Sequence, residues 1–185
     1  EISPVVSAGV VLANDPFTST LEAQYGTSGY EQAPVSGTIG AGLEWSGHGS
    51  GPLLRAGGYL RSGSLTNPDS YMKAEGGITL QTGWQVNIPK SEIAITAGLG
   101  GNLSLFSLNI QDTASANAGY SKRSSIGAST GLKFNDGVRV EFTVDRSTAE
   151  HGYYNLESGS FIIDAQPQLS GGAQVVIPLE KKKEK

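Results

Sequence analysis

The chain has 185 residues, enough for one domain, but only 37% of them are hydrophobic and 26 are glycine. A net charge of −4 provides no overall positive field for nucleic acid, so we expect no nucleic-acid partner. Cysteine is absent, which excludes disulfides and thiol ligands, and no apolar stretch reaches the roughly 18 residues that a transmembrane helix requires.

The first segment, residues 1–16, contains an apolar stretch from Val5 to Ala13 that ends before Asn14-Asp15-Pro16. Proline interrupts regular pairing, so this stretch does not run directly into the next one. We interpret residues 1–16 as an N-terminal extension or the start of the first strand. The main fold is then expected over residues 17–178, with a charged tail over residues 179–185.

From residue 17 onwards, polar and apolar residues alternate in segment after segment. Successive side chains of a β-strand point to opposite faces, so each segment predicts a strand with one polar and one apolar face. The predicted strands are 17–25, 35–45, 54–61, 71–88, 93–110, 125–134, 138–145 and 161–177. Segment 71–88 is about three times the usual strand length, which suits a strand that crosses a bilayer. In segment 93–110 the phase slips at Phe106, which predicts a bulge.

The connections between these strands fall into two length classes. Short turns are predicted at 46–51, 89–91 and 135–137, and the last contains the hairpin sequence Asn-Asp-Gly. Longer polar loops are predicted at 26–34, 63–70, 111–122 and 147–158. The two classes alternate strictly, which is typical of outer-membrane barrels with short periplasmic turns and long external loops.

Strand number follows from the position of the termini. Counting Val5 to Ala13 as a separate strand would give nine strands and would leave the N-terminus on the long-loop side. An even number keeps both termini on the short-turn side. The sequence therefore predicts an all-β fold, an eight-stranded antiparallel up-and-down transmembrane β-barrel.

The alternating spans of about ten residues, the two classes of connection and the even strand number resemble small bacterial outer-membrane barrels of the OmpA, OmpX and OmpW type. The resemblance is one of architecture and covers residues 17–178. It implies a location in the bacterial outer membrane, where membrane lipid surrounds the barrel wall. A soluble all-β binding barrel, with its apolar faces turned to a core, is the alternative.

In the transmembrane interpretation the polar faces point into the lumen and gather charges of both signs. The expected lumen charge network consists of Glu22, Glu44, Arg55, Arg61, Lys73, Glu75, Lys133, Arg139, Glu141, Asp145 and Asp164. Acids and bases nearly cancel, and side chains just fill the interior of an eight-stranded barrel. We therefore expect a salt-bridged polar lumen, with a narrow pore for ions and small solutes as the alternative.

Aromatic residues on the apolar faces lie within a few residues of the short-turn ends. Side chains of this kind concentrate at the level of the lipid headgroups in membrane barrels. The expected membrane-interface aromatics are Phe17, Trp45, Trp84 and Phe134.

The function expected from these features is that of a membrane anchor or a surface-exposed interaction module, with no enzymatic activity, cofactor or metal. Tyrosine supplies contact area at low entropic cost, so the long loops are candidate contacts for an extracellular or envelope protein. The candidate loop contacts are Tyr30, Tyr120, His151, Tyr153 and Tyr154. His48 and Ser50 resemble the His-x-Ser pair of PagL-type lipid A deacylases, but no acid follows to orient the imidazole, and turn chemistry explains them better.

Overall fold

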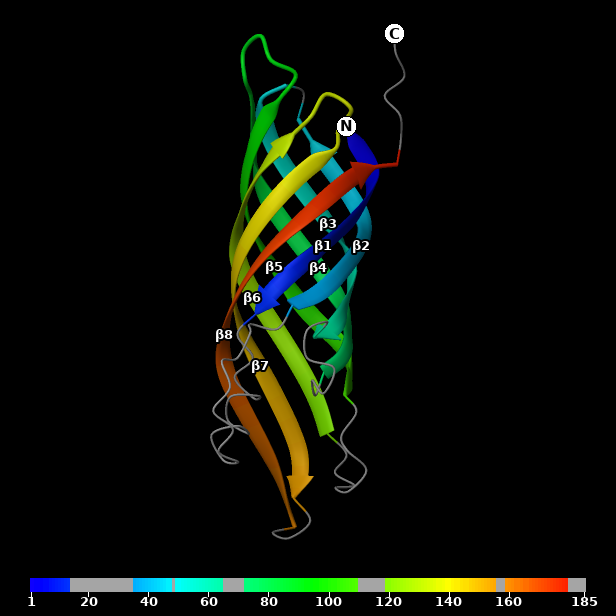
Figure 1. Ribbon diagram of the computed structural model, residues 1–185, viewed down its shortest axis with the longest axis vertical. Coiled ribbons are helices and arrows are strands. Elements are labelled where there is room, and N and C mark those ends of the chain that lie inside the picture. Colours follow the sequence, from blue (N-terminus) through cyan, green and yellow to red (C-terminus); the bar gives the residue numbers. More distant parts are fainter. Residues whose placement is uncertain (14–34, 48, 65–71, 110–118, 156–158, 180–185) are drawn as a thin grey trace.

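In the computed structural model, eight strands pair consecutively, and the first also pairs with the last (Figure 1). The structure describes residues 1–13, 35–47, 49–64, 72–109, 119–155 and 159–179. The strands are β1 (Ile2–Ala13), β2 (Val35–Ser46), β3 (Gly51–Ser64), β4 (Met72–Asn87), β5 (Ala94–Asn109), β6 (Gly119–Lys133), β7 (Arg139–Asn155) and β8 (Ser160–Pro178). All neighbours are antiparallel, which confirms the predicted closed, eight-stranded up-and-down barrel.

The period-two pattern of the sequence becomes an inside and an outside. Along β3, Arg55 is buried in the lumen, whereas its neighbour Leu54 is 44% exposed on the outer face. Among the described side chains, the buried apolar residues are only Val5, Leu53, Ala94 and Val176. The interior of this barrel is therefore mainly polar, and its large apolar side chains lie outside.

The short turns form where they were predicted. At 135–137, Gly137 has a φ of 86° and its N–H donates to the Phe134 carbonyl over 2.9 Å, while the Asp136 carboxylate accepts from the Val138 N–H over 3.0 Å. These contacts explain the Asn-Asp-Gly sequence, because glycine adopts positive φ without strain and aspartate caps the turn. The start of β1 and the end of β8 lie on the same side of the barrel as the short turns (Figure 1).

The phase slip at Phe106 is a bulge, as predicted. Gly76 pairs with Phe106 and Gly77 pairs with Ser104, so Leu105 is the extra residue of β5. Leu105 and Phe106 consequently both lie on the outer face, 65% and 55% exposed. The Phe106 ring covers Gly76, where a Cβ atom would lie 2.2 Å from the ring.

The first strand differs from the expected boundaries. Residues of β1 already pair with β2 on one side and with β8 on the other, so Ile2–Ala13 is a complete member of the wall, not an extension of it. Its inward side chains include Val5 and Val11 beside Ser3 and Ser7, so apolar residues occur on both faces and the alternation is weak. The predicted strand 17–25 and the predicted loop 26–34 lie outside the described residues.

The predicted loop 147–158 is wrong. Residues 147–155 belong to β7 and pair with β6 and β8, as far as the pair Asn155–Ser160. Residues 119–122 of the predicted loop 111–122 likewise belong to β6. Figure 1 shows the β7–β8 hairpin reaching past the ends of β1 and β2, away from the termini. Polar residues occupy both faces in this region, so no alternation marks the strands.

Closely spaced glycines let the wall bend around this narrow interior. Gly42 and Gly57 are direct partners on β2 and β3, and a Cβ on Gly57 would lie 2.4 Å from the Ala41 carbonyl oxygen. No side chain fits there without a backbone shift. The adjacent Gly58 differs, because a Cβ there would meet only the Gly77 oxygen at an ordinary 3.5 Å.

We predict that Gly57→Ala lowers the free energy of unfolding by about 1–3 kcal/mol, the usual cost of overpacking. Gly58→Ala is the matched control and should leave stability unchanged or raise it by less than about 1 kcal/mol. Urea titration of the folded protein, followed by tryptophan fluorescence, measures both. Equal stability of the two variants would contradict the close approach of β2 and β3.

Candidate functional site

The most deeply buried charge is the guanidinium of Arg139, at the start of β7, whose side chain is 1% exposed. One edge forms an ion pair with Glu44 of β2, and Nε lies 2.6 Å from Oε1 of Glu141. Strands β2 and β7 are not neighbours in the barrel. The Arg139–Glu44 contact therefore crosses the lumen and ties two opposite parts of the wall together.

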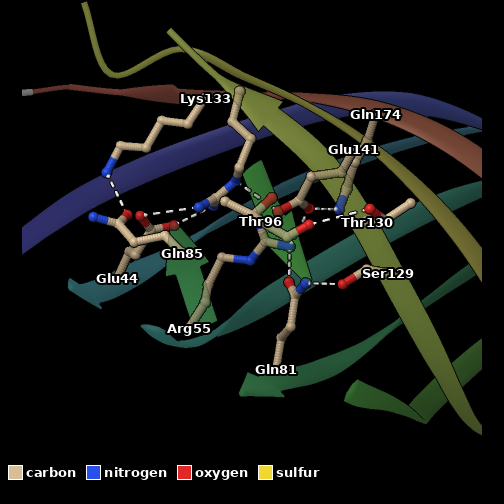
Figure 2. A network of polar contacts seen from close by, with 11 residues as sticks. Glu44, Arg55, Gln81, Gln85, Thr96, Ser129, Thr130, Lys133, Glu141 and Gln174 are labelled. Atoms are coloured by element: carbon tan, nitrogen blue, oxygen red, sulfur yellow. Dashed lines mark hydrogen bonds and ion pairs between the residues drawn. The ribbon is translucent and has the colours of Figure 1, made fainter. Parts of the chain in front are cut away.

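Glu141 extends this bridge to two more strands (Figure 2). Its Oε2 accepts hydrogen bonds from Nη2 of Arg55 over 2.8 Å and from Nε2 of Gln174 over 2.7 Å. Arg55 also donates to Gln81. Ionised groups in a dry interior need this density of partners, since removal from water costs several kcal/mol per charge.

Amide groups complete the short-turn end of the network. Lys133 of β6 donates to Oε1 of Gln85 over 3.2 Å (Figure 2). Gln85 in turn donates to the Gly49 carbonyl in the turn between β2 and β3. We call the whole set the polar plug. It consists of Glu44, Arg55, Gln81, Gln85, Lys133, Arg139, Glu141 and Gln174.

A second cluster of charges lies farther from the short turns. Arg61 of β3 is the direct cross-strand partner of Glu75 of β4. Tyr59 donates its hydroxyl to Oε1 of Glu75 over 2.6 Å, and Nη1 of Arg123 lies 3.6 Å from Oε2. With Asp145 of β7, these side chains line a cavity of about 140 Å³ that borders the polar plug at Arg55.

Eight of the predicted lumen charges face the interior. They are Glu44, Arg55, Arg61, Glu75, Lys133, Arg139, Glu141 and Asp145. Lys73 and Asp164 lie on β4 and β8, with side chains outside the described part, and Glu22 lies outside the described residues altogether. The structure thus gathers the inward charges into two clusters.

Sequence reasoning missed Arg123 and the interior glutamines. Arg123 shares the polar parity of Ser125, two residues later on β6, but the predicted strand began at residue 125. Continuing the alternation by one step would have found it. The glutamines were passed over because only charged groups were considered, although Gln81 accepts a hydrogen bond from Arg55 and Gln174 donates one to Glu141.

Three of the predicted interface aromatics lie on the outer face near the short turns. Trp45, Trp84 and Phe134 are 42%, 54% and 40% exposed. The fourth, Phe17, lies outside the described residues. Their position at a membrane interface stays a prediction.

The candidate loop contacts are placed differently from the prediction. Tyr120 lies on β6, and His151, Tyr153 and Tyr154 lie on β7, so these four residues belong to paired strands. Tyr30 lies outside the described residues, as does His48. The Ser50 hydroxyl accepts a hydrogen bond from the Asn87 N–H over 3.0 Å, which gives it a structural role in the turn.

Comparison of the sequence with models of known protein families and with curated proteins gives no match in either case. Within the described ranges, no helix is long and apolar enough to cross a membrane. The chain is an all-β protein whose closed, eight-stranded antiparallel barrel has the architecture of the small OmpA- and OmpX-type barrels.

We predict that Arg139→Gln destabilises the barrel by about 3–5 kcal/mol, because it leaves Glu44 and Glu141 with less compensation in the interior. Adding Glu44→Gln should recover part of this loss, since two neutral amides can hydrogen-bond across the lumen. Arg146→Gln, on the exposed outer face of the same strand, is the control and should change stability by less than about 0.5 kcal/mol. The cycle consists of the parent, Arg139→Gln, Glu44→Gln and the double variant, whose denaturant midpoints are compared, and additive effects would refute the cross-lumen coupling.

Proposed function

We propose that this protein is a bacterial outer-membrane β-barrel that acts as a membrane anchor or surface-exposed interaction module, without enzymatic activity. The observation that carries the proposal is the inverted distribution of side chains. Among the described residues, large apolar side chains are exposed on the outer faces of all eight strands, whereas the buried positions are mostly polar or charged. A surface of this kind is favourable in contact with the hydrocarbon interior of a bilayer.

The extent of this apolar surface argues against a soluble barrel. Exposed apolar patches of soluble monomers rarely exceed a few hundred Å², because apolar area in water costs about 25 cal/mol per Å². Here Ile39, Leu80 and Leu99, on three different strands, are 58%, 58% and 63% exposed. A soluble binding barrel would turn these side chains inward.

The height of the apolar surface fits a membrane. On β1 the outward residues run from Ile2, which pairs with Trp45, to Leu12. Ten residue steps span about 33 Å along a strand, or about 25 Å along the axis at a tilt near 40°. On β7 the exposed side chains of Phe142 and Val144 are followed by the exposed Arg146, a charge suited to the headgroup level.

The interior favours an anchor over a steady pore. The polar plug spans the lumen through Arg139 and Glu44, and the cavity beside it has a volume of about 140 Å³. Eight strands leave little lumen in any case.

The β7–β8 hairpin supports a role at the surface. It continues beyond the apolar band, with pairing as far as Asn155 and Ser160. A paired hairpin holds its shape better than a loop, so an extracellular or envelope protein would meet a preformed surface. Membrane lipid would be the partner of the apolar band below it.

We predict that Ile78→Arg, near the middle of the apolar band, costs about 2–4 kcal/mol of stability in lipid, against about 0–1 kcal/mol for Ser124→Arg at its edge. Both positions face outward and are exposed, so packing is matched. Folding into vesicles followed by denaturant titration measures the difference, and heat-modifiable migration on a gel reports the closed barrel. Equal costs, or a parent protein that stays dissolved without detergent, would favour the soluble alternative.

A separate prediction concerns sidedness. In intact cells an impermeant thiol reagent should label Ser160→Cys, at the base of the β7–β8 hairpin tip, and should miss Glu92→Cys in the turn between β4 and β5. Both positions are exposed, and the chain contains no native thiol that would interfere. Labelling of Glu92→Cys alone would mean that the short turns face outward.

A further inference from the structure

The cavity beside the polar plug is lined by three arginines from two strands, namely Arg55 and Arg61 of β3 and Arg123 of β6. Since Arg55 and Arg61 share one strand and Arg123 comes from another, the donors approach the cavity from two sides of the barrel. Arg55 is 8% exposed and therefore nine-tenths buried.

Several of these guanidinium nitrogens are buried and have no hydrogen-bond partner within the described part of the chain. They are Nη1 of Arg55, Nε of Arg61, and Nε and Nη1 of Arg123. A buried donor without an acceptor costs about 1–3 kcal/mol, and more when it is charged. The folded protein would therefore gain from an acceptor placed in the cavity.

Glu75 and Glu141 are already engaged, whereas Asp145, which also lines the cavity, has no hydrogen-bond or ion-pair partner among the described residues. Both oxygens of Glu75 have partners, Tyr59 and Arg123, and Glu141 serves Arg55, Arg139 and Gln174. The inward-facing charges that the structure describes carry one positive charge in excess. The cations are Arg55, Arg61, Arg123, Lys133 and Arg139, and the acids are Glu44, Glu75, Glu141 and Asp145.

We propose that this cavity binds a small oxyanion, with Arg61 and Arg123 as its main ligands and Arg55 at its floor. A guanidinium presents several N–H donors in a planar fork that matches the oxygens of a phosphate or a carboxylate. Ser125 and Asn102 line the same space and add neutral donors. The cavity, with a volume of about 140 Å³, is large enough to admit one such anion.

The test is isothermal titration of the full-length folded protein, in detergent micelles, with inorganic phosphate, using acetate and chloride at matched ionic strength as the other arms. We expect saturable binding of phosphate, weaker binding of acetate and none of chloride. Arg61→Gln and Arg123→Gln should each weaken phosphate binding at least about tenfold, because each removes a charge-assisted contact. Arg146→Gln, which removes an arginine from the outer face, should bind as the parent does.

Lack of saturable phosphate binding by the folded parent would overturn the proposal and leave water as the occupant of the cavity. An equal loss in Arg146→Gln would also overturn it, because binding would then follow overall charge. Gel migration reports folding, and if a glutamine variant does not fold, Arg123→Lys replaces it. That variant keeps the charge but not the fork, and unchanged affinity would reject the site. The result is independent of membrane insertion, since a soluble barrel with this cavity would bind phosphate equally.

Discussion

Closure of the sheet is the constraint on which the other features depend. The pairing of β1 with β8, from Val5–Pro178 to Ala13–Ser170, removes both edges and divides every strand into an inner and an outer face. Eight strands enclose a space that side chains can nearly fill. The polarity of the outer face then determines whether the barrel is stable in water or in an apolar solvent. In this barrel the polar face is enclosed and the apolar face lies outside.

A narrow polar interior imposes two opposing demands. The wall must bend tightly, which the Gly42–Gly57 pair allows, and long charged side chains must still find room. Glycine meets both demands. It has no side chain that would keep neighbouring strands apart, and it leaves space in the lumen for long charged side chains. At Gly127, for example, a Cβ would lie 2.0 Å from a carboxylate oxygen of Asp145. The high glycine content of the sequence thus belongs to the lumen as much as to the wall.

Much of the wall could be predicted because local rules govern it. Alternation identified β2 to β6, the first half of β7 and nearly all of β8, Asn-Asp-Gly predicted one hairpin, and the phase slip located the bulge at Leu105. The misses have one cause. Apolar residues occur on both faces of β1, and polar residues occur on both faces of residues 147–155 of β7, so period two carries little signal there. Pairing across the lumen was equally out of reach, because register determines only neighbouring strands, and Arg139 meets Glu44 from a strand that is not its neighbour.

The two charge clusters differ in a way that their composition does not reveal. In the polar plug, acids and bases alternate around Arg139 and Glu141, so most donors meet an acceptor. In the second cluster, Glu75 must serve Tyr59 and Arg123, and several guanidinium N–H groups remain without acceptors among the described residues. Replacing a fully hydrogen-bonded buried network with apolar groups is often neutral for stability. A buried network with unpaired donors, in contrast, lowers the stability of the folded protein. The unpaired guanidinium N–H groups lie next to a cavity, and an anion bound there would offset the destabilisation that they cause. Side chains needed only to fill the barrel would not explain why these donors are unpaired.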